Sequence, residues 1–139
     1  MNGAIALVMS ARATDPDDLE LMAWHALLLS KRGQDAAAIP LLERLITSID
    51  INVQAPALAM LAVCYDTVGR GADAMETARA ALAVDPTRIP PATTLGLRLV
   101  EAGKVEEALA VLERALPHAK KPKQRESIEK LIAVARAKR

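Results

Sequence analysis

Two histidines and one cysteine are the side chains in this sequence that could supply metal ligands or a nucleophile. His25 and His118 lie far apart, and neither has a second His or a Cys nearby at the spacing of a metal site. Cys64 lies in a stretch with helical periodicity, where a small buried apolar role is expected for it. The chain also has no glycine-rich phosphate loop and no nucleophile elbow. We therefore expect no enzymatic activity, no metal ion and no cofactor.

The composition favours one helical domain. The 139 residues are 52% hydrophobic but only 1% aromatic, so alanine and leucine must fill the core. Sandwiches and barrels are built from short alternating runs of Val, Ile, Thr and aromatic residues, which are absent. A charged fraction of 25% and a net charge of +1 leave enough apolar surface to bury, which argues against disorder.

No targeting or membrane-spanning segment is expected. The apolar stretch at residues 4–9 is too short to cross a bilayer, and no basic residue precedes it as in a signal peptide. A single cysteine excludes a framework of disulfides within the chain. These features predict a cytoplasmic protein that does not associate with membranes.

The C-terminal segment is strongly basic. Residues 120–139 hold eight Lys or Arg and two Glu. Nucleic-acid binding favours basic surfaces with interleaved aromatic residues, and this segment has none. We therefore expect no nucleic-acid partner, and we interpret the charges as the solvated side of a terminal helix. The alternative is attraction to an acidic partner or a lipid surface.

Three glycines mark an internal repeat. Gly33, Gly69 and Gly103 are separated by 36 and then 34 residues. The recurring positions are Ala26, Ala62 and Gly96 seven residues before each glycine, Leu29, Tyr65 and Leu99 four before, Ala38, Ala74 and Ala108 five after, Leu42, Ala78 and Leu112 nine after, and Leu45, Ala81 and Ala115 twelve after. This spacing predicts pairs of amphipathic helices that meet at small residues, with a glycine ending the first helix of each pair.

At these residues the chain resembles the tetratricopeptide repeat (TPR) family, whose repeat is 34 residues long. The resemblance implies an all-α fold: a right-handed α-solenoid of helix-turn-helix repeats in a single domain, residues 1–139. Three repeats are expected, at residues 19–50, 55–86 and 89–120. The last core layer of a solenoid needs a cover, and an apolar spacing along residues 122–137 predicts a capping helix there.

The repeat spacing also assigns the N-terminus. Residues 2–14 match the second helix of a repeat whose first helix is absent, as in a fragment of a longer array or a chain that starts with half a repeat. Its apolar face, which includes Ala4, Ile5 and Val8, is then predicted to be an open edge through which copies could form a homo-oligomer.

Prolines refine the predicted helix boundaries. Pro56 and Pro90 are expected where helices begin, because the missing N–H has no helical partner there. Pro40 falls inside a predicted helix, where it removes a bond to the carbonyl of Ala36. That helix is expected to start late or to bend.

In proteins of this family the first helices of the repeats line a concave groove in which partners lie. The residues that map to this groove are Ala23, Trp24, Leu27, Ala59, Met60, Val63, Thr93, Thr94 and Leu97. They include no Lys, Arg or Asn of the kind that grips a carboxylate. Leu27, Val63 and Leu97 form an apolar stripe suited to a partner helix or extended segment. In a tight superhelix the same side chains would instead pack against neighbouring helices.

The leading hypothesis is a non-enzymatic protein–protein interaction module that binds a peptide or helix of a partner protein in this groove. One alternative is a small chaperone of the type III secretion kind, which is similar in size and in its apolar concave face. Another is a self-assembling oligomerisation domain that uses the N-terminal helix.

Overall fold

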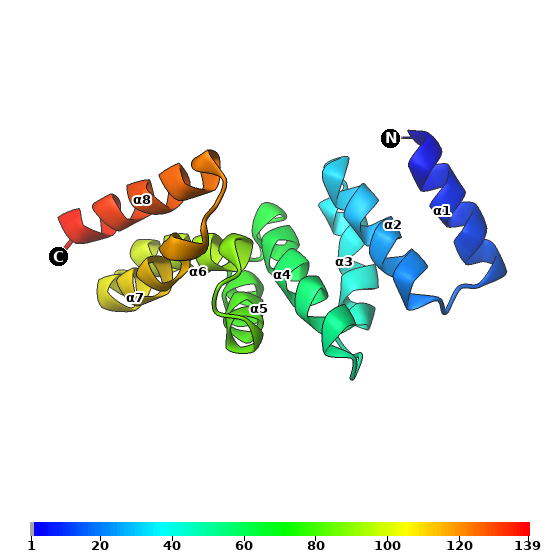
Figure 1. Ribbon diagram of the computed structural model, residues 1–139, viewed down its shortest axis with the longest axis horizontal. Helices are drawn as coiled ribbons and strands as arrows, with labels where there is room; N and C mark the ends of the chain where they lie inside the picture. The colour runs from blue at the N-terminus through cyan, green and yellow to red at the C-terminus, as the bar shows by residue number, and fades with distance from the viewer. Residues whose placement is uncertain (1) are drawn as a thin grey trace.

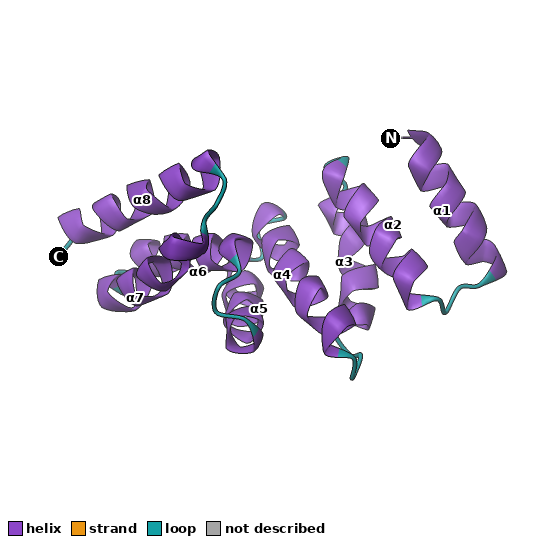
Figure 2. Cartoon of the chain, viewed as in Figure 1, coloured by secondary structure: helices purple, strands orange, loops and turns teal. Residues whose placement is uncertain are grey.

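The computed structural model describes residues 2–139, and this part of the chain is built from helices and short loops without strands (Figure 2). The α-helices are α1 (Asn2–Thr14), α2 (Leu19–Lys31), α3 (Asp35–Leu45), α4 (Ile51–Thr67), α5 (Gly71–Val84), α6 (Ile89–Glu101), α7 (Val105–Ala115) and α8 (Pro122–Ala137), with a short 3-10 helix η1 (Leu116–His118) before α8. They follow one another along the long axis, with α1 and α8 at opposite ends (Figure 1). No helix in residues 2–139 has both the length and the apolar character needed to cross a membrane.

Three tight turns join α2 to α3, α4 to α5, and α6 to α7. Their glycines, Gly33, Gly69 and Gly103, have φ values of +77°, +87° and +80°, a region that other residues rarely adopt. The residue after each glycine donates its N–H to a carbonyl five residues earlier, as in Arg70 to Tyr65 at 2.8 Å. This is the Schellman arrangement that ends a helix at a glycine. The predicted glycine-ended helix pairs are confirmed.

Small residues let the helices of each pair come close together. Ala26, Ala62 and Gly96 are all buried. The contact is tightest at Gly96, where an added Cβ atom would lie 2.5 Å from Cδ2 and 2.7 Å from Cγ of Leu112. Leu112 is itself fully buried, so it has no free space into which to move. The backbones of α6 and α7 therefore approach to a distance that only glycine allows at this position.

The core consists of two apolar clusters that meet at α4 and α5. The first joins residues of α2 to α5 and includes Met22, Leu42 and Leu61. The second runs from α4 to α8 and includes Leu99 and Leu112. Helix α8 contributes Ile128, Ile132 and Ala135 to the second cluster and contacts both α6 and α7. It thus covers the last layer of the core.

The structure corrects two details of the predicted helix starts, and the bend predicted at Pro40 stays a prediction. Helix α3 begins at Asp35, two residues after its glycine, and α5 and α7 begin at the same offset. Pro40 does not delay the start, because both Pro40 and Ala36 lie on the exposed side, where water can reach the unpaired carbonyl. Pro56 does not begin a helix either, since α4 starts at Ile51 and has one more turn at its N-terminus than the repeat spacing predicts.

The contact at Gly96 yields a stability prediction. Gly96→Ala should lower the free energy of unfolding by about 1–3 kcal/mol, because the new methyl group overpacks the core against Leu112. Gly71→Ala is the matched control: it also lies in a helix, nothing lies within 4 Å of its added Cβ, and it should be neutral or stabilising by up to about 1 kcal/mol. Urea unfolding of the two variants would measure the difference. Equal stability of the two would contradict the close approach.

Candidate functional site

Side chains of α2, α3 and α4 line a two-lobed groove, here called the α2–α4 groove. The larger lobe, of about 380 Å³, is lined by Leu19, Glu20, Ala23, Leu42, Leu45, Asn52, Val53, Pro56, Ala57 and Met60. The smaller lobe, of about 220 Å³, is lined by Glu20, Ala23, Trp24, Leu27, Pro56 and Met60. Because Glu20, Ala23, Pro56 and Met60 line both lobes, the lobes adjoin and form one surface.

The residue types in the helices explain why this space stays open. Ala23 and Ala57 have side chains too short to fill it, and Pro56 is compact. Leu42 and Leu45 of α3 form the bottom of the larger lobe and are almost fully buried. The extra turn at the start of α4 adds Asn52 and Val53 to the wall. The groove is thus a preformed apolar surface above the first core cluster.

Trp24 is the largest apolar side chain on this surface. Its exposed fraction is 51%, which is high for the only tryptophan of the chain. Leu27 and Met60 beside it are half-buried. Large exposed apolar side chains next to a hollow are typical of surfaces that bind another molecule.

The predicted groove residues divide into three sets. Ala23, Trp24, Leu27 and Met60 line the α2–α4 groove. Val63, Thr93 and Leu97 are half-buried along α4 and α6 and do not line it.

Ala59 and Thr94 were expected on the groove surface, and that placement is wrong: they are only 7% and 8% exposed. Helix α4 touches α2, α3, α5 and α6, and α6 touches α4, α5, α7 and α8, whereas α2 touches only α1, α3 and α4 among the strongly contacting helices. Helices α4 and α6 thus each have one more contacting helix than α2. This is consistent with the burial of Ala59 and Thr94, whereas Ala23 and Trp24, at the matching positions of α2, are exposed. The lining residues that were not predicted are Leu19, Glu20, Leu42, Leu45, Asn52, Val53, Pro56 and Ala57. For Glu20, its position at the start of α2, three residues before Ala23, was the available signal.

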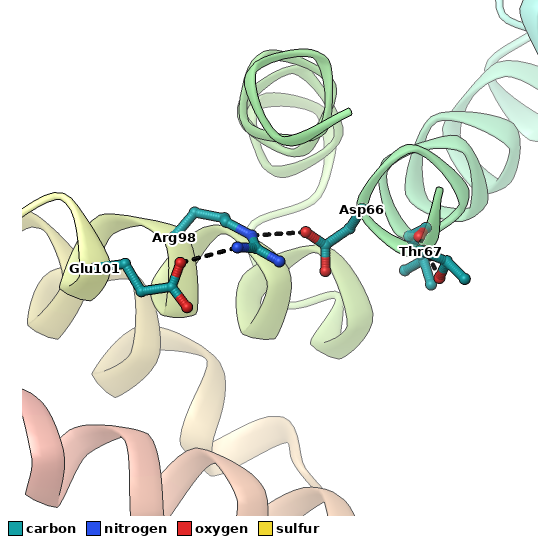
Figure 3. Close-up of polar contacts among 5 residues, drawn as sticks. Asp66, Thr67, Arg98 and Glu101 are labelled. Atoms are coloured by element: carbon teal, nitrogen blue, oxygen red, sulfur yellow. Dashed lines mark hydrogen bonds and ion pairs between the residues drawn. The ribbon is translucent and has the colours of Figure 1, made fainter. Parts of the chain in front are cut away.

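A polar contact ties α4 to α6 further along the stack. Arg98 Nε donates to Asp66 Oδ1 at 2.7 Å, and its Nη1 donates to Glu101 Oε2 at 2.8 Å (Figure 3). The hydrogen bond to Asp66 is the main cause of the raised pKa of Arg98. No ion pair joins α2 to α4 in residues 2–139. The first junction between successive repeats therefore has no ion pair, whereas the second is bridged by charge.

Cys64 belongs to a buried polar cluster and not to a reactive site. Its Sγ donates to Asp35 Oδ1 at 3.3 Å, and Ser30 Oγ donates to the same oxygen at 3.0 Å. Burial, and then the hydrogen bond to Asp35, raise the pKa of the Cys64 thiol to about 12. A thiol that stays protonated is a poor nucleophile. The cluster connects α2, α3 and α4.

His25 connects α1 to α2. Its Nδ1 lies 2.8 Å from Arg12 Nη1, and since an arginine can only donate, the imidazole accepts this hydrogen bond in its neutral form. Burial, and then the charge of Arg12, lower the pKa of His25. His118 is exposed in η1. Residues 2–139 contain no group of three or more His, Cys, Asp or Glu side chains placed to hold a metal ion.

The predicted open edge of α1 needs one correction. Ile5 is only 7% exposed, because it faces α2. The repeat spacing carried this signal, since Ile5 matches Ile39 and Leu109, which are buried. Ala4 is exposed and Val8 half-buried, and the largest exposed side chain on this helix is Leu7, at 73%.

Paired helices, glycine turns and a covering last helix define an α-solenoid of helix-turn-helix repeats. Solved structures have the same architecture. A crystal structure of MamA superposes with a TM-score of 0.71 at 18% identity over 99% of this chain and 87% of that one. For TTC0263, a thermophilic TPR protein of Thermus thermophilus, the TM-score is 0.74 at 21% identity, and the match covers 99% of this chain and 78% of that one. For the TPR domain of Sgt2 from Aspergillus fumigatus, the TM-score is 0.68 at 17% identity, and the match covers 88% of this chain and 79% of that one.

No protein-family model and no curated protein sequence matches the chain. The shared geometry nevertheless confirms the predicted all-α repeat architecture, and the protein has the TPR fold.

The Arg12–His25 contact gives a pH prediction. The folded protein binds a proton at His25 less readily than the unfolded chain, whose histidine has a pKa of about 6.5. Well above this pKa, His25 is neutral in both the folded and the unfolded state. As the pH falls through this pKa, the unfolded chain binds the proton more readily than the folded protein does, so the free energy of unfolding should fall. His25→Gln should lose this part of the pH dependence between about pH 7.5 and about pH 5.5 in urea unfolding. The exposed His118→Gln variant should keep it, and an unchanged profile for His25→Gln would contradict the role of the contact.

Proposed function

We propose that this protein is a non-enzymatic protein-binding module whose α2–α4 groove holds an apolar segment of a partner protein. The observation that carries the proposal is the pair of adjoining lobes beside the half-exposed Trp24. The lobes exist in the folded chain before any partner arrives, so binding does not require the groove to be ordered. A pocket of this size with mostly apolar walls fits one or two bulky side chains of a peptide or helix.

The polar side chains support the same proposal. The thiol of Cys64 is held as a donor to Asp35, and the imidazole of His25 accepts from Arg12. The Cys64 and His25 side chains are thus engaged in contacts between helices. Neither of them lines the groove.

Peptides selected from a displayed random library against the folded chain provide a test. Titration of a selected peptide should shift the emission of Trp24, the only tryptophan, to shorter wavelength, because the ligand removes water from its indole. Leu27→Glu should weaken binding about tenfold or more, because it places a carboxylate against the apolar ligand. The control is Val134→Glu, which introduces the same charge at an apolar residue of α8, away from the groove. Equal binding by the two variants, both shown to be folded by urea unfolding, would place the site elsewhere.

We propose self-association through α1 as a second candidate function. Ala4, Leu7, Val8 and Ala11 share one uncharged face of α1 at helical spacing. In the complete repeats the positions that match Ala4, such as Ala38 and Ala74, are fully buried by the first helix of the same pair. A second copy that covers this face would bury the corresponding side chains of α1.

Light scattering tests this second candidate. If copies associate through α1, Leu7→Glu should shift the mass toward the monomer, because it places a charge at the centre of the shared face. Val134→Glu at the opposite end should leave the mass unchanged. A wild-type chain that is monomeric at about 100 μM, well above the dissociation constants of stable dimers, would exclude this function.

A further inference from the structure

Glu20 is the only charged side chain among the residues that line the two lobes of the α2–α4 groove. It belongs to both lobes and thus to the wall that they share. The residue is exposed, and its carboxylate forms no ion pair in the part of the chain that the structure describes. Any segment that fills both lobes must therefore pass beside this carboxylate.

The nearby helix ends do not compensate the charge of Glu20. The free N–H groups at the start of a helix favour anions, but Asp18 already accepts from the N–H groups of Glu20 and Leu21 at 3.0 and 3.2 Å. Asp50 in the same way accepts from the N–H of Asn52 at 3.0 Å at the start of α4. Asp17 pairs with Arg44 at 2.7 Å. Asp18 and Asp50 therefore carry negative charge at the starts of α2 and α4, and the N–H groups of Glu20, Leu21 and Asn52 are already engaged.

We infer that the partner segment carries a Lys or Arg between two bulky apolar side chains. The apolar side chains occupy the two lobes, and the cation pairs with Glu20 on the wall between them. An apolar segment without a positive charge would cover the Glu20 carboxylate and remove its water without compensation, and an acidic segment would add repulsion. This inference rests on the proposed function and names the chemistry of the partner.

A displayed library of random 12-residue peptides is the probe. It would be selected in parallel against the wild-type chain, Glu20→Gln and Glu76→Gln. Glu76 is the matched control, because it is an exposed glutamate of α5 that forms no ion pair in residues 2–139. We expect Lys or Arg to be enriched between apolar positions with the wild type and with Glu76→Gln, but not with Glu20→Gln. A synthetic selected peptide should bind Glu20→Gln about two- to fivefold more weakly at low salt, and about 1 M NaCl should remove this difference.

The outcomes separate this inference from the proposed function. If Leu27→Glu weakens the selected peptides but Glu20→Gln and Glu76→Gln bind them equally, the groove is the site and the inference is wrong. Selected peptides that are neutral or acidic between their apolar positions would overturn it too. If Leu27→Glu leaves binding unchanged, the proposed function fails, and the inference fails with it.

Discussion

The close approach of the two helices in each pair is the constraint on which the rest of the structure depends. It exists because Ala26, Ala62 and Gly96 place almost no side-chain volume between the backbones. At Gly96 even a methyl group would overlap Leu112. Pairs that are closed in this way can bury leucine on the sides that face the next pair, so a chain without phenylalanine still builds two continuous core clusters.

The two junctions between successive first helices differ in chemistry. Arg98 bridges α4 and α6 through Asp66. Between α2 and α4 the contacts near the groove are apolar and the side chains are short, as at Ala23 and Ala57. At the junction of α4 and α6, the ion pair presents charged groups to solvent. At the junction of α2 and α4, the short side chains leave an apolar hollow that a partner can reach. The α2–α4 groove lies at the first of these two junctions.

The few polar groups of the interior connect helices instead of forming a site. Asp35 accepts from both Ser30 and Cys64, which joins α2, α3 and α4. Buried donors and acceptors must be paired, and here a single carboxylate accepts from one hydroxyl and one thiol. The cluster therefore ties α2 to α4 through α3.

The sequence by itself determined the helix pairs, their glycine turns and the small residues at their contacts. These follow from local physics: glycine is required at positive φ, and a period of 3.6 residues shows which side of a helix is apolar. The groove residues Ala23, Trp24, Leu27 and Met60 followed from the resemblance to the TPR family, whose first helices line a concave surface. Only the tertiary structure decided that α4 starts at Ile51, that Thr94 is buried, and that Glu20 lines both lobes. The period of a helix identifies its apolar side, but the number and position of neighbouring helices decide how much of that side remains exposed.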